Sequence, residues 1–302
     1  MEDKKDILES LAGVAQLKHD NVIKDDAIEN IAQYYCDSMT DENINDVLGD
    51  YNTHLVTLVG FSEVGKSTFV ASLYHEFMCT GEIDGYKFID SDTYVGFERR
   101  AYIRNESLKT SKRNSRTTMM EGQFLTLTLS KDDILNKLII SDRAGETYKN
   151  SYTSNLSQVK QDKGLINSHH IIFFIDSSSV NNEDDYSDFC DDFQLLLSRM
   201  ASAGVFNIPK VYDIIYNKID LIQTDEVKEL FSKQSLDFEN RMKNDYGINI
   251  SNRFEIISNN MKDQGQKDVF KYIVNTLNSH RNCQYEESNW VQTLLNELRK
   301  SI

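Results

Sequence analysis

The sequence lacks the features that mark membrane, secreted and lipid-anchored proteins. No apolar run approaches the roughly 18 residues that a membrane helix needs, and the longest, Ile171–Ile175, has the length of a strand. The acidic start MEDKKDILES has no apolar signal-peptide core, residue 2 is a glutamate where myristoylation requires glycine, and the end "RKSI" carries no lipid-anchor signal. We therefore expect a cytoplasmic protein.

Proline and cysteine are scarce as well. The single proline, Pro209, leaves few rigid breakpoints, so domain borders have to be inferred from changes in pattern. The cysteines are widely spaced and form no C-x-x-C pair, which argues against a metal cluster or a disulfide framework. They are Cys36, Cys79, Cys190 and Cys283.

Positive charge is also in short supply. The formal net charge is −15, which disfavours non-specific attraction to nucleic acid or anionic lipid because both need local cationic density. The charge is uneven: residues 1–53 hold 13 acidic and 4 basic residues, whereas residues 98–116 hold 7 basic and 2 acidic ones. This second stretch is a basic island in an acidic protein.

Changes of pattern divide the chain into three predicted parts. Residues 1–53 form an acidic helical extension, in which apolar residues recur at three- and four-residue spacing and the last short helix ends at Gly49. Residues 54–280 form the main α/β domain. Residues 281–302 end in an amphipathic helix with one apolar face.

Apolar strands alternate with amphipathic helices from residue 54 onward. This alternation is typical of an α/β fold with a mostly parallel sheet and helices on both faces. The pair 123–130 and 136–142 is separated by a short polar link and is predicted to be the one antiparallel hairpin. The six predicted strands cover residues 54–60, 123–130, 136–142, 169–176, 210–217 and 253–258. The predicted helices cover about 66–78, 185–203, 225–245 and 267–280.

The stretch GFSEVGKS, from Gly60 to Ser67, satisfies G-x-x-x-x-G-K-[ST] between a predicted strand and a predicted helix. Its glycines allow successive N–H groups to converge on phosphate oxygens, and the following helix directs its positive end at the same anion. Lys66 would reach the β- and γ-phosphates, and the Ser67 hydroxyl would ligate Mg²⁺. The predicted binding set is Gly60, Glu63, Val64, Gly65, Lys66, Ser67 and Thr68.

Two later motifs fit the same chemistry. The run DRAGE, from Asp142 to Glu146, ends the strand KLIIS; there Asp142 can hold the Mg²⁺ shell and Gly145 can offer its N–H to the γ-phosphate. The run NKID, Asn217-Lys218-Ile219-Asp220, follows the strand VYDIIY. Its last carboxylate would accept hydrogen bonds from the ring N–H and amine of guanine, a donor pair that adenine lacks, and the lysine stem can cover the base.

The motifs occur in the order GFSEVGKS, Thr117-Thr118, DRAGE, NKID and then Ser258 after the strand FEII. In this order they resemble the five motifs of Ras-like GTPases of the translation-factor (TRAFAC) class, over about residues 54–280. The long stretch before the threonines and the phrase SDRAGE are most similar to the bacterial double-GTPase-type proteins of conflict and defence systems. The resemblance implies a P-loop G domain with a six-stranded sheet, which binds GTP or GDP with Mg²⁺ and switches between nucleotide states. It also implies that Thr117 or Thr118 ligates Mg²⁺ only in the GTP state, and that Ser258 lies near the guanine oxygen.

The sequence departs from that family pattern in places. Glu146 stands where Ras-like proteins usually have the glutamine that orients the attacking water, so we expect slow intrinsic hydrolysis, on the order of 10⁻⁴ to 10⁻² s⁻¹. "SNN" replaces the usual serine-alanine pair, which leaves Ser258 as the predicted base contact. The segment between Lys66 and Thr117 is long, and its second half is the basic island.

Three interpretations of the basic island stay open. Arg113 or Arg116 can act as an arginine finger supplied in cis, as in heterotrimeric G-protein α subunits, although the offset from the threonine differs. The segment can equally be a solvated switch loop whose cations meet only bulk ions. It can also be a docking surface for an acidic partner, such as the protein's own N-terminal region.

We expect catalytic roles for Lys66, Thr117, Gly145 and Glu146, and metal ligation by Ser67, Thr117 and Asp142. The favoured function is a GTPase switch that engages a protein effector or activator through its switch segments and N-terminal helices. Deleting residues 1–50 should then spare GTP affinity and abolish partner binding. The alternatives are a guanine-nucleotide scaffold with negligible hydrolysis, with Glu146 as a brake, and a P-loop kinase, against which NKID argues.

Overall fold

The computed structural model describes residues 37–48, 52–101, 123–180, 183–258 and 265–279. The predicted helices before residue 37, the Thr117–Thr118 pair, the candidate finger residues Arg113 and Arg116 and the predicted C-terminal helix lie outside these residues. The predictions for them therefore stay predictions.

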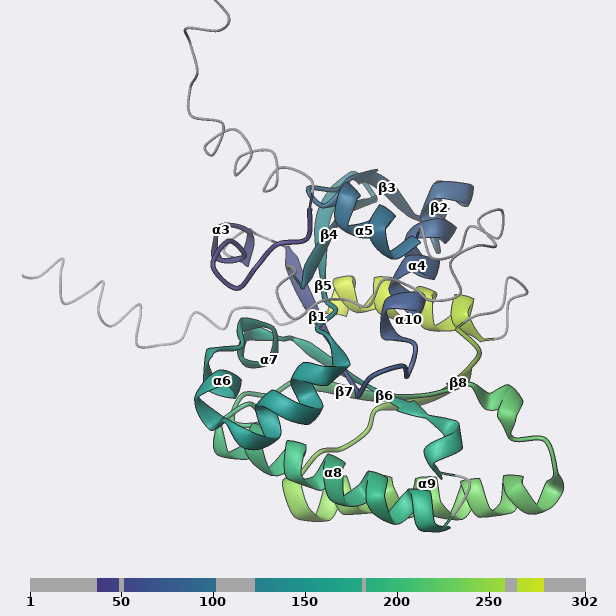
Figure 1. Ribbon diagram of the computed structural model, residues 1–302. Coiled ribbons are helices and arrows are strands. Elements are labelled where there is room, and N and C mark those ends of the chain that lie inside the picture. The colour runs from purple at the N-terminus through teal and green to yellow at the C-terminus, as the bar shows by residue number, and fades with distance from the viewer. Residues whose placement is uncertain (1–36, 49–51, 102–122, 181–182, 259–264, 280–302) are drawn as a thin grey trace, which may run out of the picture.

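Within the described residues, eight strands form one sheet in the order β2-β3-β4-β5-β1-β6-β7-β8 (Figure 1). The central pairs β5-β1, β1-β6, β6-β7 and β7-β8 are parallel, and the pairs β2-β3, β3-β4 and β4-β5 are antiparallel. All six predicted strands are present, including the predicted hairpin formed by β4 and β5. The strands are β1 (Thr53–Val59), β2 (Glu82–Ile83), β3 (Tyr86–Asp90), β4 (Phe124–Lys131), β5 (Ile134–Ser141), β6 (His170–Asp176), β7 (Val211–Asn217) and β8 (Asn252–Ile256).

The prediction of six strands with a single antiparallel hairpin was wrong, because a second hairpin, β2–β3, extends the sheet at the β4 edge. Its turn residues Asp84 and Gly85 have φ of 50° and 80°, and two successive positive φ values are what a tight two-residue hairpin turn requires. The Asp-Gly pair is a hairpin signal that the sequence contains. The two residues of β2 are too few to show an alternating pattern.

Helices cover both faces of the sheet, as predicted (Figure 1). Helices α4, α5 and α10 lie on one face of the sheet, where they pack with Val56 and Leu58 of β1. Helices α6 to α9 lie on the other face, where the core includes Val59 of β1. The helices are α3 (Asn45–Leu48), α4 (Lys66–Thr80), α5 (Tyr94–Ala101), α6 (Leu156–Gln161), α7 (Lys163–Asn167), α8 (Glu183–Ser202), α9 (Asp225–Tyr246) and α10 (Gln266–Ser279). In the part of the chain that the structure describes, no helix is both long enough and apolar enough to cross a bilayer.

Double coverage explains why the central strands read as continuous apolar runs. In β6, all residues from His170 to Ile175 are buried, and β1 is buried from His54 to Val59. A parallel strand with helices on both faces has no solvent-facing side, so it needs no polar alternation. The sheet is therefore a rigid scaffold, and functional residues can lie on the loops that follow its parallel strands.

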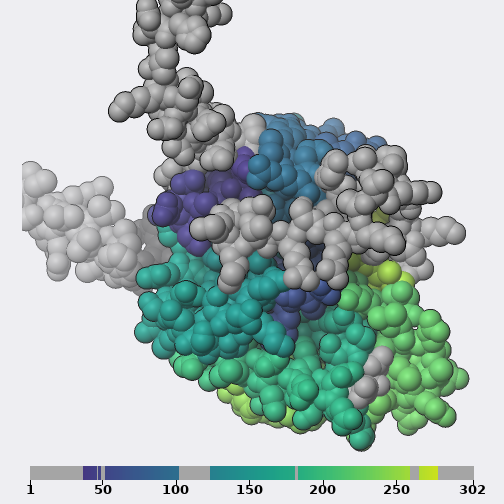
Figure 2. Space-filling view, viewed as in Figure 1, coloured from purple at the N-terminus to yellow at the C-terminus, as the bar shows by residue number. Residues whose placement is uncertain are grey.

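The described part of the N-terminal extension, residues 37–48, packs against the sheet. Met39, Ile44 and Val47 form a core cluster with Leu55, Phe124 and Ile139. The predicted short helix before Gly49 corresponds to α3. In Figure 2 the purple surface of this segment lies between blue and teal parts of the chain.

Candidate functional site

The predicted motifs meet at one edge of the sheet. Gly60 follows β1, Asp142 follows β5, Lys218 follows β7 and Ser258 comes shortly after β8. Strands β5, β1, β6, β7 and β8 run parallel in this order, so their carboxyl ends lie along the same edge. In α/β sheets, ligands bind in the crevice outside these ends.

The predicted phosphate-binding loop, from Gly60 to Ser67, wraps around the side chain of its own lysine. The Nζ of Lys66 donates hydrogen bonds to the carbonyl oxygens of Gly60 at 2.7 Å and Phe61 at 3.0 Å. Gly65 has a φ of 97°, and a Cβ placed there would lie 2.2 Å from Nδ2 of Asn217. Glycine is thus required at this position both for backbone conformation and for space.

Lys66 sits among charges that fit an anion-binding role. Burial lowers its pKa to about 8, and the nearby carboxylates of Asp142 and Glu146 act in the opposite direction. The charges of three predicted site residues, Lys66, Asp142 and Glu146, therefore lie close enough to influence one another. A phosphate group entering here would favour the charged form of Lys66 over the neutral one.

The loop after β5 lies directly on the phosphate-binding loop. A Cβ on Gly145 would meet the carbonyl carbon of Phe61 and the amide nitrogen of Ser62, each at 2.2 Å. Only glycine allows the two backbones to approach so closely. Glu146 comes next and directly precedes a π-helical turn over Thr147–Tyr152, an uncommon element that is frequently found at functional sites.

Asp142 is fully buried and forms an ion pair that the sequence did not reveal. Its Oδ2 accepts a hydrogen bond from Nε of Arg100 at 2.8 Å, and Nη1 of Arg100 donates to the carbonyl oxygen of Gly96. Arg100 belongs to the basic island, but nothing in the sequence distinguished it from the six other cations there. The pair joins helix α5 to the loop after β5.

The other carboxylate oxygen of Asp142, Oδ1, is buried and has no hydrogen-bond partner among the described residues. A buried carboxylate oxygen without a partner near Lys66 suits a water molecule of a Mg²⁺ shell. In the described residues no group of three histidine, cysteine or acidic side chains could hold a metal alone. Proteins usually hold Mg²⁺ with one or two ligands plus substrate phosphates. Ser67, in the first turn of α4, and Asp142 fit such a site.

Asn217 connects the predicted phosphate end of the site to the predicted base end. Its Nδ2 donates to the carbonyl oxygen of Val64 at 2.7 Å, and its Oδ1 accepts from the amide of Ser258 at 2.8 Å. Its own carbonyl oxygen accepts from the hydroxyl of Ser177. Asn217 is buried, so it acts as a fixed link between three loops.

The two charged residues of NKID lie at the surface end of the site. Lys218 adopts a left-handed backbone conformation with a φ of 61°, and its Nζ pairs with Oδ2 of Asp176 at 2.5 Å. Asp220 is exposed in the short 3₁₀ turn Ile219–Leu221. An exposed carboxylate beside a lysine stem is open to an incoming base.

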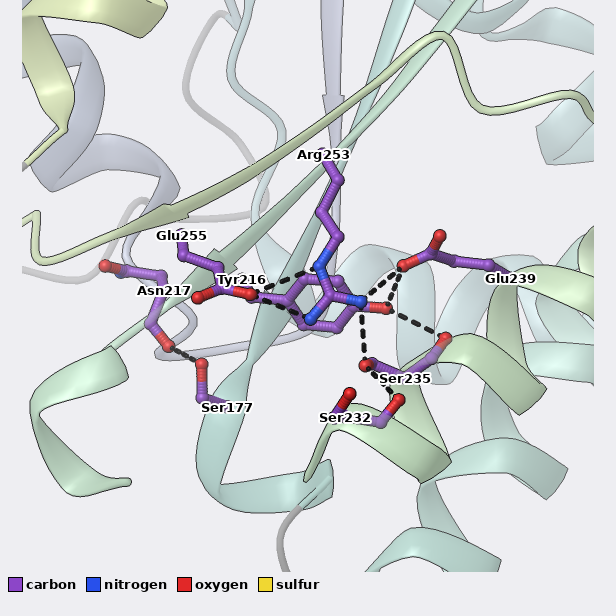
Figure 3. Close-up of polar contacts among 8 residues, drawn as sticks. All are labelled: Ser177, Tyr216, Asn217, Ser232, Ser235, Glu239, Arg253 and Glu255. Carbon is purple, nitrogen blue, oxygen red and sulfur yellow. Dashed lines mark hydrogen bonds and ion pairs between the residues drawn. The ribbon is translucent and has the colours of Figure 1, made fainter. Parts of the chain in front are cut away.

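A cation-aromatic cluster supports the strand that carries Asn217. Figure 3 shows Arg253 of β8 reaching over the ring of Tyr216, the residue before Asn217, toward Ser235 and Glu239 of α9. The guanidinium carbon lies 4.6 Å from the centre of that ring, and Nη1 donates to Oγ of Ser235 at 2.8 Å. The hydroxyl of Tyr216 donates to Glu239 at 3.0 Å. β7, β8 and α9 are thereby joined behind the base end of the site.

The chain is similar to known proteins over most of its length. The family model described as Double-GTPase 2 matches residues 54–272. Many solved structures resemble the chain. One is the crystal structure of the bacterial selenocysteine-specific elongation factor EF-Sec, with 16% identity and a TM-score of 0.40; the match covers 75% of this chain and 29% of that one. Among curated proteins, none matches by sequence.

Proposed function

The chain belongs to the Double-GTPase 2 family, and from this premise we propose that it binds GTP with Mg²⁺, hydrolyses it to GDP and changes state with the nucleotide. Membership of the family agrees with the resemblance to double-GTPase-type proteins that the motifs indicated. It favours a GTPase over a P-loop kinase. A role in conflict or defence, and an effector or activator bound through the switch segments, are further parts of the proposal that rest on the resemblance.

One observation carries the proposal: three motifs far apart in sequence converge at the carboxyl ends of parallel strands. Lys66 lies near the carboxylates of Asp142 and Glu146, and Asn217 ties the phosphate-binding loop to Ser258. A glycine-rich turn without a ligand would need none of these links. The arrangement supports a site with a phosphate end and a base end.

Each end of the site has a defined task in the proposed reaction. Lys66 and the backbone N–H groups of its loop bind the phosphates, and Gly145 donates its N–H to the γ-phosphate. Glu146 accepts a hydrogen bond from the attacking water and orients it. Mg²⁺, held by Ser67 and Asp142, would neutralise phosphate charge when bound. Asp220 accepts the two N–H donors of guanine.

A guanine-nucleotide scaffold with negligible hydrolysis is the second candidate. The observation that favours it is Glu146 itself, a carboxylate close enough to influence Lys66. An anion beside the γ-phosphate repels the negative charge of the reacting groups, whereas glutamine would not. The same side chain therefore separates the two candidates.

The decisive experiment measures binding and turnover of GTP by the full chain with Mg²⁺, beside Lys66→Ala and Asp220→Asn. Lys66→Ala should abolish both, because it removes the cation that meets the phosphates. Asp220→Asn should weaken GTP and favour xanthosine triphosphate, since the asparagine amide can donate to the C2 oxygen that xanthine has in place of the amine. Unchanged binding in both variants would refute the assigned site.

Glu146→Gln then chooses between the candidates. Measurable wild-type turnover that changes in Glu146→Gln supports a GTPase in which this side chain acts on the water. Tight GTP retention without turnover in the wild type supports the scaffold, and turnover gained in Glu146→Gln would identify the carboxylate as its brake. If the wild type binds neither GTP nor GDP, both candidates fail.

A further inference from the structure

Residues 37–41, here called the brace, contact helix α5, the first residues of β4 and the loop after β5. Its middle residue, Met39, pairs with the first residues of β4. The amide of Met39 donates to the carbonyl oxygen of Phe124 at 2.8 Å, and its own carbonyl accepts from the amides of Gln123 at 2.9 Å and Phe124 at 3.0 Å. The Met39 side chain is buried, so this attachment is part of the core.

The first two residues of the brace contact helix α5. Oδ2 of Asp37 pairs with Nη1 of Arg99 at 2.5 Å. The backbone of Ser38 lies so close to Gly96 that a Cβ on that glycine would come within 2.7 Å of the Ser38 amide nitrogen. Helix α5 ends at residue 101 and β4 begins at 124. The brace therefore holds both flanks of the segment that contains Thr117 and Thr118.

The last residue of the brace reaches the loop after β5. Oδ2 of Asp41 pairs with Nη2 of Arg143 at 2.7 Å, and its Oδ1 accepts from the amide of Lys163 at 3.1 Å. Arg143 also pairs through Nε with the buried carboxylate of Asp162 at 2.7 Å. In Figure 2 the purple surface, to which the brace belongs, adjoins both the blue and the teal surfaces.

The loop that Asp41 holds is the one whose glycine packs on the phosphate-binding loop. Asp142 donates its amide to the carbonyl oxygen of Gln123, which is bonded through its own amide to Met39. The braced arrangement is thus the one in which Gly145 lies against Phe61 and Ser62. In general, contacts that are present in one arrangement and absent from another bias the equilibrium toward the first.

We propose that the brace is a positioning element for the GTP-bound form, an inference that rests on the proposed function. It keeps the flanks of residues 102–122 and the Asp142–Glu146 loop where a γ-phosphate needs them. GDP lacks that phosphate, so its affinity depends on the phosphate-binding loop and NKID and not on the brace. The brace therefore contributes to the preference for GTP over GDP.

The test compares affinities of the full chain for a non-hydrolysable GTP analogue and for GDP. Asp41→Asn removes the charge that holds Arg143, and Gly96→Ala places a methyl group against the Ser38 backbone and the Leu125 side chain. Each should weaken the GTP analogue about fivefold, a typical coupling between two sites, and GDP by less than about twofold. The ratio of the two affinities is the readout, because simple loss of folded protein lowers both equally.

Matched controls come from the same helix and from a remote ion pair. Val95→Ala changes an exposed residue of α5, and Glu76→Gln removes the partner of Lys267 between α4 and α10. Both should leave the affinity ratio unchanged. If the wild type binds both nucleotides and neither brace variant alters the ratio, the brace inference fails while the proposed function stands. If the wild type binds neither, both fall.

Discussion

Two neighbouring arginines of α5 show how surroundings decide what a charge does. The side chain of Arg99 is 53% exposed and pairs with Asp37, whereas that of Arg100 is 6% exposed and pairs with Asp142. An exposed ion pair is screened by water and contributes little. Removing one partner of a buried pair leaves an uncompensated charge in a poorly solvated place. Arg100 is therefore structural for the apo site in a way that Arg99 is not.

We expect Arg100→Met to lower the free energy of unfolding by about 3 kcal/mol, because it leaves Asp142 buried without its partner. Arg99→Met should cost less than about 1 kcal/mol. Urea unfolding of the nucleotide-free variants measures both values. Equal, small effects would show that Asp142 finds another partner. Addition of Mg²⁺ with nucleotide should recover part of the lost free energy of unfolding in Arg100→Met but not in Arg99→Met.

At the scale of the elements, local signals were predictable and long-range ones were not. The phosphate-binding loop, its strand and its helix are contiguous, so residues 54–78 carried their own signature. The Arg100–Asp142 and Asp41–Arg143 pairs join residues 42 and 102 positions apart, and no spacing rule links them. Helix α5 was missed because Gly96 interrupts its pattern; the structure shows that the glycine makes room for the Ser38 backbone.

The N-terminal extension shows the same limit. Its acidic composition set it apart, yet Met39, Ile44 and Val47 complete a core cluster with residues of β1, β4 and β5. A deletion of residues 1–50 would open that cluster, so a loss of nucleotide affinity would not exclude a partner-binding role. A cut before residue 37 keeps the brace and the cluster, and is the better test of the partner hypothesis.

Packing between elements also gives a prediction at the base end. We expect Arg253→Lys to destabilise the protein by about 1–2 kcal/mol, because lysine cannot stack over Tyr216 and Phe231 while pairing with Glu239. Arg241→Lys, on the solvent side of α9, changes an exposed pair with Asp237 and should have almost no effect. Thermal unfolding of the two variants decides, and equal shifts would mean that the stacking contributes nothing.

At the scale of the whole molecule, the uneven charge of the chain is partly used internally. The acidic segment before residue 53 pairs with cations of the main domain at Asp37–Arg99 and Asp41–Arg143. The first of these involves the basic island, which fits the interpretation that the island docks the protein's own acidic region. The side chain of Arg99 is 53% exposed and that of Arg143 is 18% exposed, so higher ionic strength should weaken the Asp37–Arg99 pair first.

Stability should depend on pH through Lys210, which lies away from the nucleotide site. Its Nζ donates to the carbonyl oxygens of Ile166 and Ser168, each at 2.8 Å, and burial lowers its pKa from 10.5 to about 8. Below pH 8 both the folded and the unfolded chain carry the proton. Between pH 8 and 10.5 this lysine binds its proton more fully in the unfolded chain than in the folded one, so the contribution of Lys210 to the free energy of unfolding rises with pH.

A variant without this titration isolates the effect. The difference in unfolding free energy between wild type and Lys210→Gln should stay flat from pH 6 to about 8 and then grow in favour of the wild type. Titration of other groups is common to both proteins and cancels. A flat Lys210 difference up to pH 10 would mean that water reaches this ammonium and that its pKa is ordinary.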